Sequence, residues 1–339
     1  MPTAKALFFT APQKVEIREN PLPRLKEDEV LVETVCSAIS AGTEMLVYRG
    51  QFPHIADLHD DLSSDLNYPL AYGYACIGVV VDIGKLVNGN WLNRTVFAFH
   101  PHASSFIIHP SALIPIPHSL SPENACFLPN METAVNLVQD GAPILGERVL
   151  VLGQGVVGLL TASLLSEFPL EKLVTVDRFE LRRSALNVEC QRSKVKSFAP
   201  DDLRPSTLDP FDITFELSGS PSALNDAIAL TTFSGRVVIG SWYGQKRAEI
   251  DLGGAFHRSR IKLISSQVST ISPELSGRWD KSRRFDVAWK ALERIKPEKW
   301  ITQRFPIEEA GKAYQLLDEN PQETIQVIFD FRTQKSPDF

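Results

Sequence analysis

Short runs of β-branched and aromatic residues, separated by proline, glycine and asparagine, fill the first third of the chain. Runs of this composition and length predict β-strands. They occupy residues 5–9, 14–19, 29–40, 76–84, 94–99 and 105–110. Residues 50–68 are polar and irregular, which predicts a long loop of the kind that often borders a site. The pattern therefore predicts a β-rich first domain over residues 1–119.

The spacing of apolar residues becomes helical at residues 122–139, and beyond this point apolar strands alternate with amphipathic helices. This alternation predicts a parallel sheet with helices on both faces. The expected strands are 148–153, 172–177, 211–219, 235–242 and 260–267, with helices at 156–168, 179–189 and 221–233. Two further helical segments, 282–295 and 307–320, precede a last strand at 324–331. The predicted division is a β domain over 1–119, an α/β domain over 120–267 and a tail over 268–339 that returns to the β domain.

Composition and charge narrow the classes of function. The chain has 339 residues and a formal charge of −6, from 35 Lys and Arg against 41 Asp and Glu. This balance gives no electrostatic basis for binding nucleic acid or an anionic membrane. The longest apolar run, 149–165, is too short and too polar to span a bilayer, and the N-terminus lacks the pattern of a signal peptide. We therefore expect a cytoplasmic protein.

Cysteine usage agrees with a reducing compartment. The four cysteines, Cys36, Cys76, Cys126 and Cys190, lie far apart and form no C-x-x-C pair. Their spacing indicates neither a disulfide framework nor a zinc site.

A glycine-rich turn marks a dinucleotide site. Gly153, Gly155 and Gly158 form G-x-G-x-x-G between an expected strand and an expected helix. In this motif the first glycine makes the turn, the second admits a pyrophosphate and the third allows close packing of helix on strand. Val156 and Val157 open the helix, whose N-terminal N–H groups favour an anion. A structural unit without nucleotide is the alternative.

The acid that follows this turn bears on the choice of cofactor. Asp177 ends the second strand of the α/β domain, nineteen residues past Gly158. A carboxylate there accepts hydrogen bonds from the ribose hydroxyls and repels a 2′-phosphate, which favours NAD over NADP. Arg178 follows immediately and could serve a phosphate, so NADP stays the alternative.

Six stretches together carry a resemblance that covers nearly the whole chain. They are "VLGQGVVGLL", "ISAGTEMLVYRG", "YPLAYGYACIGVVVDIG", "ETA", "FELSGSPSALNDAI" and "GRVVIGSW". In these motifs the chain resembles the medium-chain dehydrogenase/reductase superfamily of zinc alcohol dehydrogenases and quinone reductases. The resemblance implies a GroES-like β domain, a Rossmann domain and an active site in the cleft between them. It also implies a homodimer that pairs through the last Rossmann strand, at 260–267.

The zinc ligands of that superfamily have no counterpart in this sequence. The matching positions hold Ala41, Tyr74, Ala75 and Pro129, none of which supplies the thiolate, imidazole or carboxylate that zinc prefers. The motifs look most like the zinc-lacking branch around bacteriochlorophyllide a dehydrogenase. We therefore expect no zinc, with Tyr74 in the vacated metal position.

Three residues are candidates for catalysis without a metal. Thr43 matches the superfamily hydroxyl that relays the substrate proton, and its alternative role is a turn cap. Tyr74 can donate or accept through its phenol, or can simply fill space. His100 aligns with a position of the substrate pocket, where an imidazole serves as acid or base, and its alternative is a surface histidine. We expect His102 to point to the other face of its extended segment.

Several further positions have expected roles in binding the cofactor or in holding the structure together. Thr133 matches a superfamily position near the nicotinamide. Ser218, Gly219 and Gly240 lie at expected strand ends, at the carboxyl edge where the nicotinamide and its ribose bind. We expect Glu44 and Arg49 to pair with each other structurally.

These observations predict a zinc-independent, NAD(P)-dependent oxidoreductase. It would transfer hydride between the nicotinamide and a small or medium-sized hydrophobic or conjugated alcohol or carbonyl. Two alternatives stay open: reduction of an activated C=C bond in an enone or quinone, and an inactive nucleotide-binding protein used as a structural unit or sensor.

Overall fold

The computed structural model describes residues 2–52, 66–187, 195–203 and 209–332. The chain divides into two compact units, one of residues 1–129 with 296–339 and one of residues 130–295. The sequence analysis predicted domain boundaries after residues 119 and 267 instead. Helix α7 (Lys281–Ile295) accounts for much of the difference, because it belongs to the second unit.

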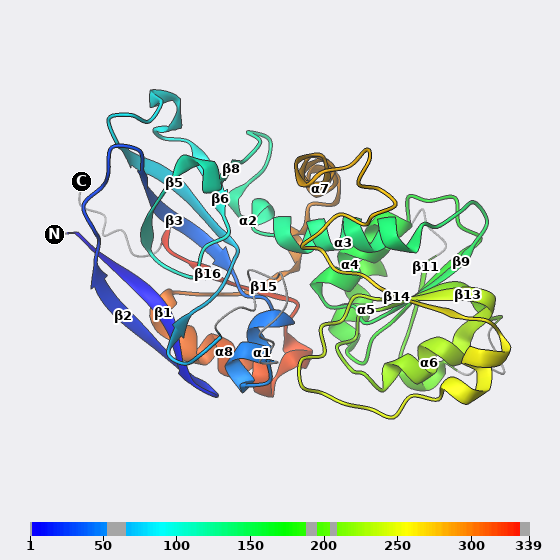
Figure 1. Ribbon diagram of the computed structural model, residues 1–339. Coiled ribbons are helices and arrows are strands. Elements are labelled where there is room, and N and C mark those ends of the chain that lie inside the picture. The colour runs from blue at the N-terminus through cyan, green and yellow to red at the C-terminus, as the bar shows by residue number, and fades with distance from the viewer. Residues whose placement is uncertain (1, 53–65, 188–194, 204–208, 333–339) are drawn as a thin grey trace. The chain divides into compact units, whose positions relative to one another are not determined.

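The first unit contains two β-sheets (Figure 1). The larger sheet has the strand order β15-β16-β3-β5-β6-β8, with β7 also paired to β3, and the smaller has the order β2-β1-β4. The strands are β1 (Thr3–Ala11), β2 (Lys14–Pro21), β3 (Val30–Ala38), β4 (Leu70–Ala71), β5 (Cys76–Ile83), β6 (Thr95–Ala98), β7 (Ser105–Ile108), β8 (Leu113–Pro115), β15 (Ile301–Phe305) and β16 (Gln326–Asp330).

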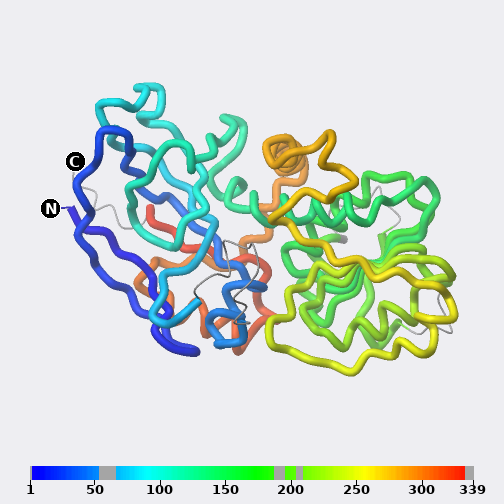
Figure 2. Tube along the Cα trace, in the orientation of Figure 1, coloured from blue at the N-terminus to red at the C-terminus, as the bar shows by residue number. Residues whose placement is uncertain are grey.

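The C-terminal residues complete the larger sheet. Strand β16 pairs antiparallel with β3 and parallel with β15. Figure 2 shows this orange and red part of the trace beside the blue strands of the N-terminus. Buried side chains from both ends of the chain, among them Phe9, Tyr314 and Phe329, share one core. Residues 301–330 therefore join the first unit, whereas residues 268–295 of the predicted tail belong to the second unit.

Among the described residues, three α-helices belong wholly to the first unit: α1 (Thr43–Arg49), α2 (Pro122–Ala125) and α8 (Ala310–Glu319). Helix α3 (Leu128–Gly141) follows α2 and crosses the boundary between the units. The sequence predicted one helix over residues 122–139, whereas the structure has a break at Cys126 and Phe127. Pro129 explains the break, because proline lacks an N–H donor and fits the first turn of a helix better than its interior.

The second unit contains one parallel sheet with the order β11-β10-β9-β12-β13-β14. This is the order of a doubly wound dinucleotide-binding sheet. Its strands are β9 (Arg148–Leu152), β10 (Lys172–Val176), β11 (Val195–Phe198), β12 (Phe211–Glu216), β13 (Thr231–Ile239) and β14 (Lys262–Ser265). Its helices, besides α3 and α7, are α4 (Val156–Leu165), α5 (Glu180–Asn187) and α6 (Ala223–Leu230).

Helices cover both faces of this sheet. Figure 1 shows α3 on one side of the strands and α6 on the other. The central strands are buried along nearly their whole length, as continuous apolar runs predict. Gly141, at the end of α3, packs so closely on Phe215 of β12 that an added Cβ would lie 2.5 Å from its ring.

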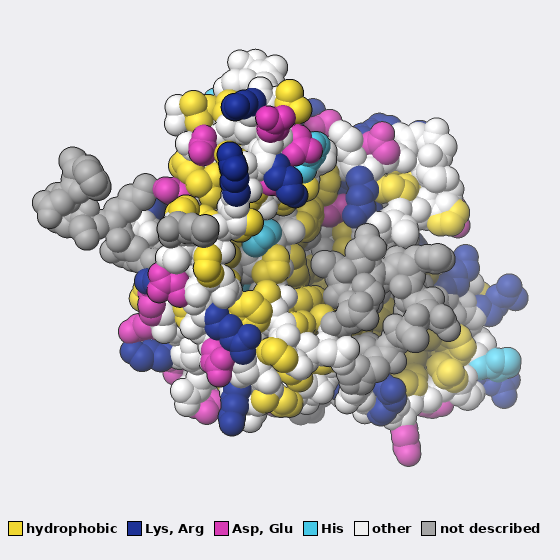
Figure 3. All heavy atoms as spheres, turned by 60° about the vertical axis from the view of Figure 1, so that its left-hand side comes forward, with side chains coloured by type: hydrophobic (Ala, Val, Ile, Leu, Met, Phe, Trp, Pro, Cys, Tyr) yellow, Lys and Arg dark blue, Asp and Glu magenta, His cyan; other side chains and the backbone are white. Residues whose placement is uncertain are grey.

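The described surface carries charges of both signs. On the face in Figure 3, Lys and Arg side chains are interspersed with Asp and Glu. Among the described helices, none combines the length and apolar character needed to cross a membrane.

A buried arginine fixes α7 to α3. The Arg284 side chain is fully buried, and its Nη2 lies 2.7 Å from Oε1 of Glu132. It also donates to Oδ1 of Asn136 at 2.6 Å and to the carbonyl oxygens of Val268 and Thr270. Every partner belongs to the second unit, so Arg284 ties three segments of that unit together.

We predict that Arg284→Ala destabilises the second unit by about 3–5 kcal/mol, because it leaves Glu132 as a buried carboxylate without its cation. Arg294→Ala is the matched control on the same helix. Arg294 pairs with Glu167 at 2.8 Å on the surface, and such pairs contribute about 0–1 kcal/mol. Urea unfolding at neutral pH measures both variants. Equal losses of stability would contradict the assignment.

Candidate functional site

Helix α1 and the segment before β5 bring two predicted catalytic residues together. Thr43 is the first residue of α1, and Tyr74 lies just ahead of β5. Hydrogen bonding from the Ser40 and Thr43 side chains lowers the pKa of the Tyr74 phenol, against the larger opposing effect of burial. Gly42 occupies the N-cap of α1 without a side-chain cap, so Thr43 does not serve as the cap.

The Tyr74 phenol is a proton donor at neutral pH. Burial first and the Glu44 carboxylate second raise the pKa of Tyr74 to about 12, against the opposing effect of hydrogen bonding from Ser40 and Thr43. The side chain also packs edge-to-face against Tyr72, with the ring centroids 6.4 Å apart. The phenol therefore stays protonated throughout the physiological range.

Glu44 is the centre of a buried polar network that the sequence did not reveal. Its side chain is fully buried on α1. One carboxylate oxygen accepts the Ser40 N–H at 2.8 Å. The other lies 2.9 Å from Nε2 of His102 and accepts the hydroxyl of Tyr314 at 2.6 Å. The expected Glu44–Arg49 pair is therefore wrong.

The helix explains why that pair does not form. Residues five apart lie on different faces of an α-helix, whereas residues three or four apart lie on the same face. Arg49 instead pairs with Asp318 of α8, with its Nε 2.6 Å from Oδ1. Helix α1 thus contacts α8 through two carboxylates, Glu44 with Tyr314 on the buried side and Asp318 with Arg49 nearer the surface.

His102 extends the network to β3. Its Nδ1 lies 2.7 Å from the Ser37 hydroxyl, and both side chains are fully buried. The ring lies directly against Gly73, where an added Cβ would come within 2.6 Å of it. Gly73 also has a φ of +122°, which only glycine adopts readily.

His100 has different surroundings from His102. Its ring stacks on Phe106 at a centroid distance of 3.9 Å, and its Nδ1 lies 2.8 Å from the carbonyl oxygen of Pro101. Burial lowers the pKa of His100, which favours the neutral imidazole. The described hydrogen bonds of His100 do not reach Tyr74 or Thr43, and its role as an acid or base stays a prediction.

In the second unit, the glycine-rich turn has the geometry that its spacing predicts. Gly153 has a φ of +95°, and an added Cβ at Gly158 would lie 1.9 Å from the Gly153 carbonyl oxygen. Gly155 is the N-cap of α4, and an added Cβ there would meet nothing within 4 Å. Val156 and Val157 form the first turn of α4. The turn thus leaves open space at Gly155 and none at Gly158.

Asp177 fastens this turn to the next strand. One of its carboxylate oxygens accepts the Gln154 N–H at 2.7 Å, and the other accepts the Phe179 N–H at 2.8 Å. A carboxylate has about four acceptor positions, so each oxygen can accept a further hydrogen bond. The Gln154 side chain is fully buried, and its Oε1 has no hydrogen-bond partner among the described residues.

Three arginines surround Asp177 and Phe179. The guanidinium groups of Arg178 and Arg182 each lie 4.9 Å from the centre of the Phe179 ring. Arg183 donates to the carbonyl oxygens of Asp177 and Arg178 at 2.8 Å. Asp177 therefore lies within a cluster of positive charge.

The predicted residues at the strand ends of the second unit differ in their surroundings. The Ser218 N–H donates to the buried Glu216 carboxylate at 2.9 Å, and the Tyr243 hydroxyl donates to it at 2.5 Å. Gly219 has a φ of +70°. An added Cβ at Gly240 would lie 2.6 Å from Leu137, so Gly240 is required for packing.

The remaining position, Thr133, lies on α3 and is partly exposed. Glu216 and Tyr243 were missed by the sequence analysis, although Glu216 stands only two residues before Ser218. A buried acid at the end of an apolar strand was the available signal.

The described residues contain no group of three or more His, Cys, Asp or Glu side chains arranged to hold a metal ion. Cys36, Cys76 and Cys126 are buried. Burial raises the pKa values of Cys76 and Cys126, so both stay thiols rather than metal-binding thiolates. Cys190 lies outside the described residues.

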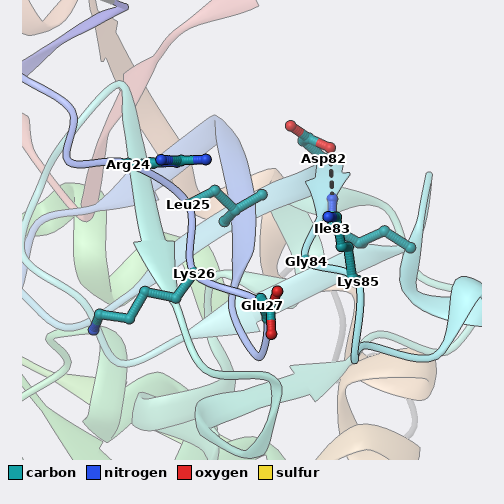
Figure 4. A pocket seen from close by; sticks show the side chains of 8 residues that line it. All are labelled: Arg24, Leu25, Lys26, Glu27, Asp82, Ile83, Gly84 and Lys85. Atoms are coloured by element: carbon teal, nitrogen blue, oxygen red, sulfur yellow. Dashed lines mark hydrogen bonds between the residues drawn. The ribbon is translucent and has the colours of Figure 1, made fainter.

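A surface pocket of the first unit lies at the turn after β5. Its lining residues come from two segments: Arg24, Leu25, Lys26 and Glu27, and Asp82, Ile83, Gly84 and Lys85 (Figure 4). None of the predicted site residues contributes to it, and Lys26 is paired with Glu29 at 2.8 Å.

Comparison with known proteins shows the fold and a group of distant relatives. No family model matches the chain. L-threonine 3-dehydrogenase of Stenotrophomonas maltophilia is 24% identical over 264 residues, which cover 68% of this chain and 74% of that protein.

Two solved structures share the fold at low identity. The short chain alcohol dehydrogenase rspB of Escherichia coli, complexed with NADH, has a TM-score of 0.75 at 18% identity over 97% of this chain and 99% of its own. L-idonate 5-dehydrogenase of Escherichia coli has a TM-score of 0.77 at 17% identity over 97% and 98%. The predicted fold, a GroES-like β domain plus a Rossmann sheet, is confirmed.

Proposed function

We propose that the chain is a zinc-independent, NAD(P)-dependent oxidoreductase that transfers hydride between the nicotinamide and a hydrophobic or conjugated alcohol or carbonyl. The observation that carries this proposal is the glycine-rich turn, which is closed at Gly158 and open at Gly155, with Asp177 behind it. The relatives support it, because the proteins named above are dehydrogenases and one was solved with NADH.

The residues of the turn fit a dinucleotide. The N–H groups at the start of α4 would bind the pyrophosphate, and Asp177 would accept hydrogen bonds from the ribose hydroxyls. Thr133, Ser218, Gly219 and Gly240 are our candidates for the nicotinamide end. We propose NAD as the preferred cofactor, with Arg178 and Arg182 as the phosphate partners that NADP would require.

The residues of the first unit do not fit a catalytic zinc. The described residues offer no three convergent ligands, and the positions that match the superfamily ligands hold Ala41, Tyr74, Ala75 and Pro129. The proposed mechanism therefore contains no metal-dependent step. A further part of the proposal is a homodimer formed at strand β14, which is the edge of its sheet and carries the exposed Leu263.

In this proposal the Tyr74 phenol replaces the Lewis acid. A bound dinucleotide would supply the hydride in the reductive direction. The Tyr74 phenol would then donate a hydrogen bond, and afterwards its proton, to the substrate oxygen, and in the oxidative direction the phenolate would accept the proton that the alcohol loses. Thr43, whose side chain lowers the pKa of Tyr74 through hydrogen bonding, is the candidate relay of that proton. In the oxidative direction, a carbinol on a conjugated ring shares its developing positive charge with the ring and so depends less on a metal.

We predict that the protein binds NADH more tightly than NADPH. The Asp177 carboxylate would lose a ribose hydrogen bond and meet a phosphate, at a cost of about 1–3 kcal/mol. Gly155→Ala should leave folding intact and weaken NADH binding at least about tenfold, because a methyl group would occupy the space beside the pyrophosphate. Calorimetric titration measures both effects.

Gly277→Ala is the matched control for this binding test. It adds a methyl group in the same unit, also with nothing within 4 Å, but away from the turn. NADPH binding as tight as NADH binding would contradict the cofactor preference. Equal affinities of the Gly155→Ala variant and the wild type would contradict the site itself.

We predict that Tyr74→Phe reduces turnover about 10²–10⁴-fold on the best substrate, because the variant lacks the proton donor. The assay compares conjugated alcohols, aliphatic alcohols and enones with both nicotinamide cofactors. Tyr72→Phe, which changes the neighbouring tyrosine in the same way, should lose less than about tenfold. His100→Ala, measured alongside, tests the remaining candidate.

Four outcomes would contradict parts of this proposal. Wild-type rates in Tyr74→Phe would transfer the proton step to Thr43 or His100. About one zinc per chain by elemental analysis, with activity lost on chelation, would overturn the zinc-independent assignment. Ethanol as the best substrate would refute the argument from charge delocalisation, and enones as the best substrates would favour C=C reduction.

A further inference from the structure

A row of polar residues follows one face of helix α3 in the second unit. Glu132, Asn136 and Asp140 are four residues apart, so their side chains lie on the same face of the helix. Glu132 and Asn136 are buried, and burying such groups is costly unless hydrogen-bond partners replace their water. These partners come from the residues that follow strand β14 and from helix α7, which lies beside α3 (Figure 1).

Arg284 of α7 joins this polar row to the segment after β14. Its fully buried guanidinium group binds Glu132 at 2.7 Å and Asn136 at 2.6 Å. The same group donates to the carbonyl oxygens of Val268 and Thr270. Both carbonyl groups therefore point to the guanidinium group, which fixes the path of the backbone beyond β14.

Ser266 makes a second connection between the same two segments. Its hydroxyl donates to a carboxylate oxygen of Asp140 at 2.6 Å and accepts an N–H of Asn136 at 2.9 Å. Its backbone N–H donates to the carbonyl oxygen of Ile239 at 3.0 Å, which extends the pairing of β13 with β14. The ends of β13 and β14 are thereby joined to each other and to α3.

These contacts lie at the carboxyl edge of the sheet, on the side away from Asp177. Asp177 follows β10, whereas Gly240 follows β13 and packs on α3, where an added Cβ would lie 2.6 Å from Leu137. In a doubly wound sheet the two halves of a dinucleotide bind on either side of the point where the strand order reverses. With the adenosine half at Asp177, the nicotinamide half would face β12, β13 and β14.

We propose that Arg284 and Ser266 are positioning residues for the nicotinamide half of the cofactor. They hold α3, which carries Thr133, at a fixed spacing from residues 266–270. The inference deepens the proposed function and rests on it for the dinucleotide itself. The Asp177 carboxylate accepts backbone N–H groups of the glycine-rich turn and of its own segment, so the adenosine half does not depend on these two residues.

The test compares NADH with ADP, which has the adenosine and the two phosphates but lacks the nicotinamide. In calorimetric titrations of the wild-type protein, NADH should bind more tightly than ADP. Arg284→Lys keeps the positive charge but loses the planar set of donors. It should weaken NADH binding about tenfold, the equivalent of one lost hydrogen bond, and change ADP binding less than about twofold.

Arg236→Lys is the matched control in the same unit. Arg236 also pairs with a glutamate, Glu147, at 2.8 Å, and donates to the carbonyl oxygens of Gly141 and Ala142 at 2.6 and 2.9 Å. These partners lie at the C-terminal end of α3 and ahead of β9, at the opposite edge of the sheet. The substitution therefore loosens the same helix away from the proposed site, and it should change the affinities for NADH and ADP less than about twofold.

Ser266→Ala provides a second test variant, because it loosens residues 266–270 and leaves the pair of Arg284 with Glu132 in place. It should also weaken NADH binding and spare ADP binding. Ser266→Ala carries the test by itself if Arg284→Lys does not fold.

Three results would overturn the inference and leave the proposed function standing. They are NADH and ADP binding weakened equally in the test variants, neither of them weakened, and the same selective loss of NADH binding in Arg236→Lys. Wild-type protein that binds NADH no more tightly than ADP would also overturn it, because the nicotinamide would then have no subsite. If neither nucleotide binds the wild-type protein, the proposed function fails and the inference fails with it.

Discussion

The buried Glu44 carboxylate is the constraint on which the first unit's site depends. It takes hydrogen-bond donors from the segment before α1, from the segment before β7 and from α8, so three parts of the chain must converge for it to be satisfied. Leaving such a carboxylate without donors costs several kcal/mol. Gly73 makes room for His102 beside it, and Tyr74 follows one residue later. The position of the candidate catalytic phenol is thus a consequence of how one acid is buried.

In the second unit, buried carboxylates also accept hydrogen bonds that hold turns in place. Asp177 accepts backbone N–H groups from Gln154 and Phe179, which fixes the glycine-rich turn against the end of β10. Glu216 does the same for Ser218 at the end of β12. In each case a buried carboxylate at a strand end replaces its water with backbone donors. Acids at such positions stabilise the local backbone, whether or not they also bind a cofactor.

The sequence predicted the structural features that depend on residues close together in the chain. It missed the contacts between residues that are far apart in the chain. The glycine-rich turn lies within six residues, and strand and helix periodicities are equally local, so the fold and this turn followed from the pattern. The Glu44 network joins residues separated by 58 and 270 positions. A single sequence carries no signal for such contacts. The expected Glu44–Arg49 pair illustrates the error, because proximity in sequence was taken for proximity on the helix.

The Glu44 carboxylate places a negative charge in the part of the first unit that holds the candidate catalytic phenol of Tyr74. A zinc ion stabilises an alkoxide, whereas a carboxylate destabilises one and stabilises a developing positive charge. With Tyr74 protonated, the proposed site favours an oxygen that gains a proton as its carbon gains hydride. In the reverse direction the Tyr74 phenolate would take the proton that a carbinol loses, and a conjugated ring would spread the positive charge that develops as hydride leaves. The preference for such substrates therefore rests on electrostatics as well as on the loss of the metal ligands.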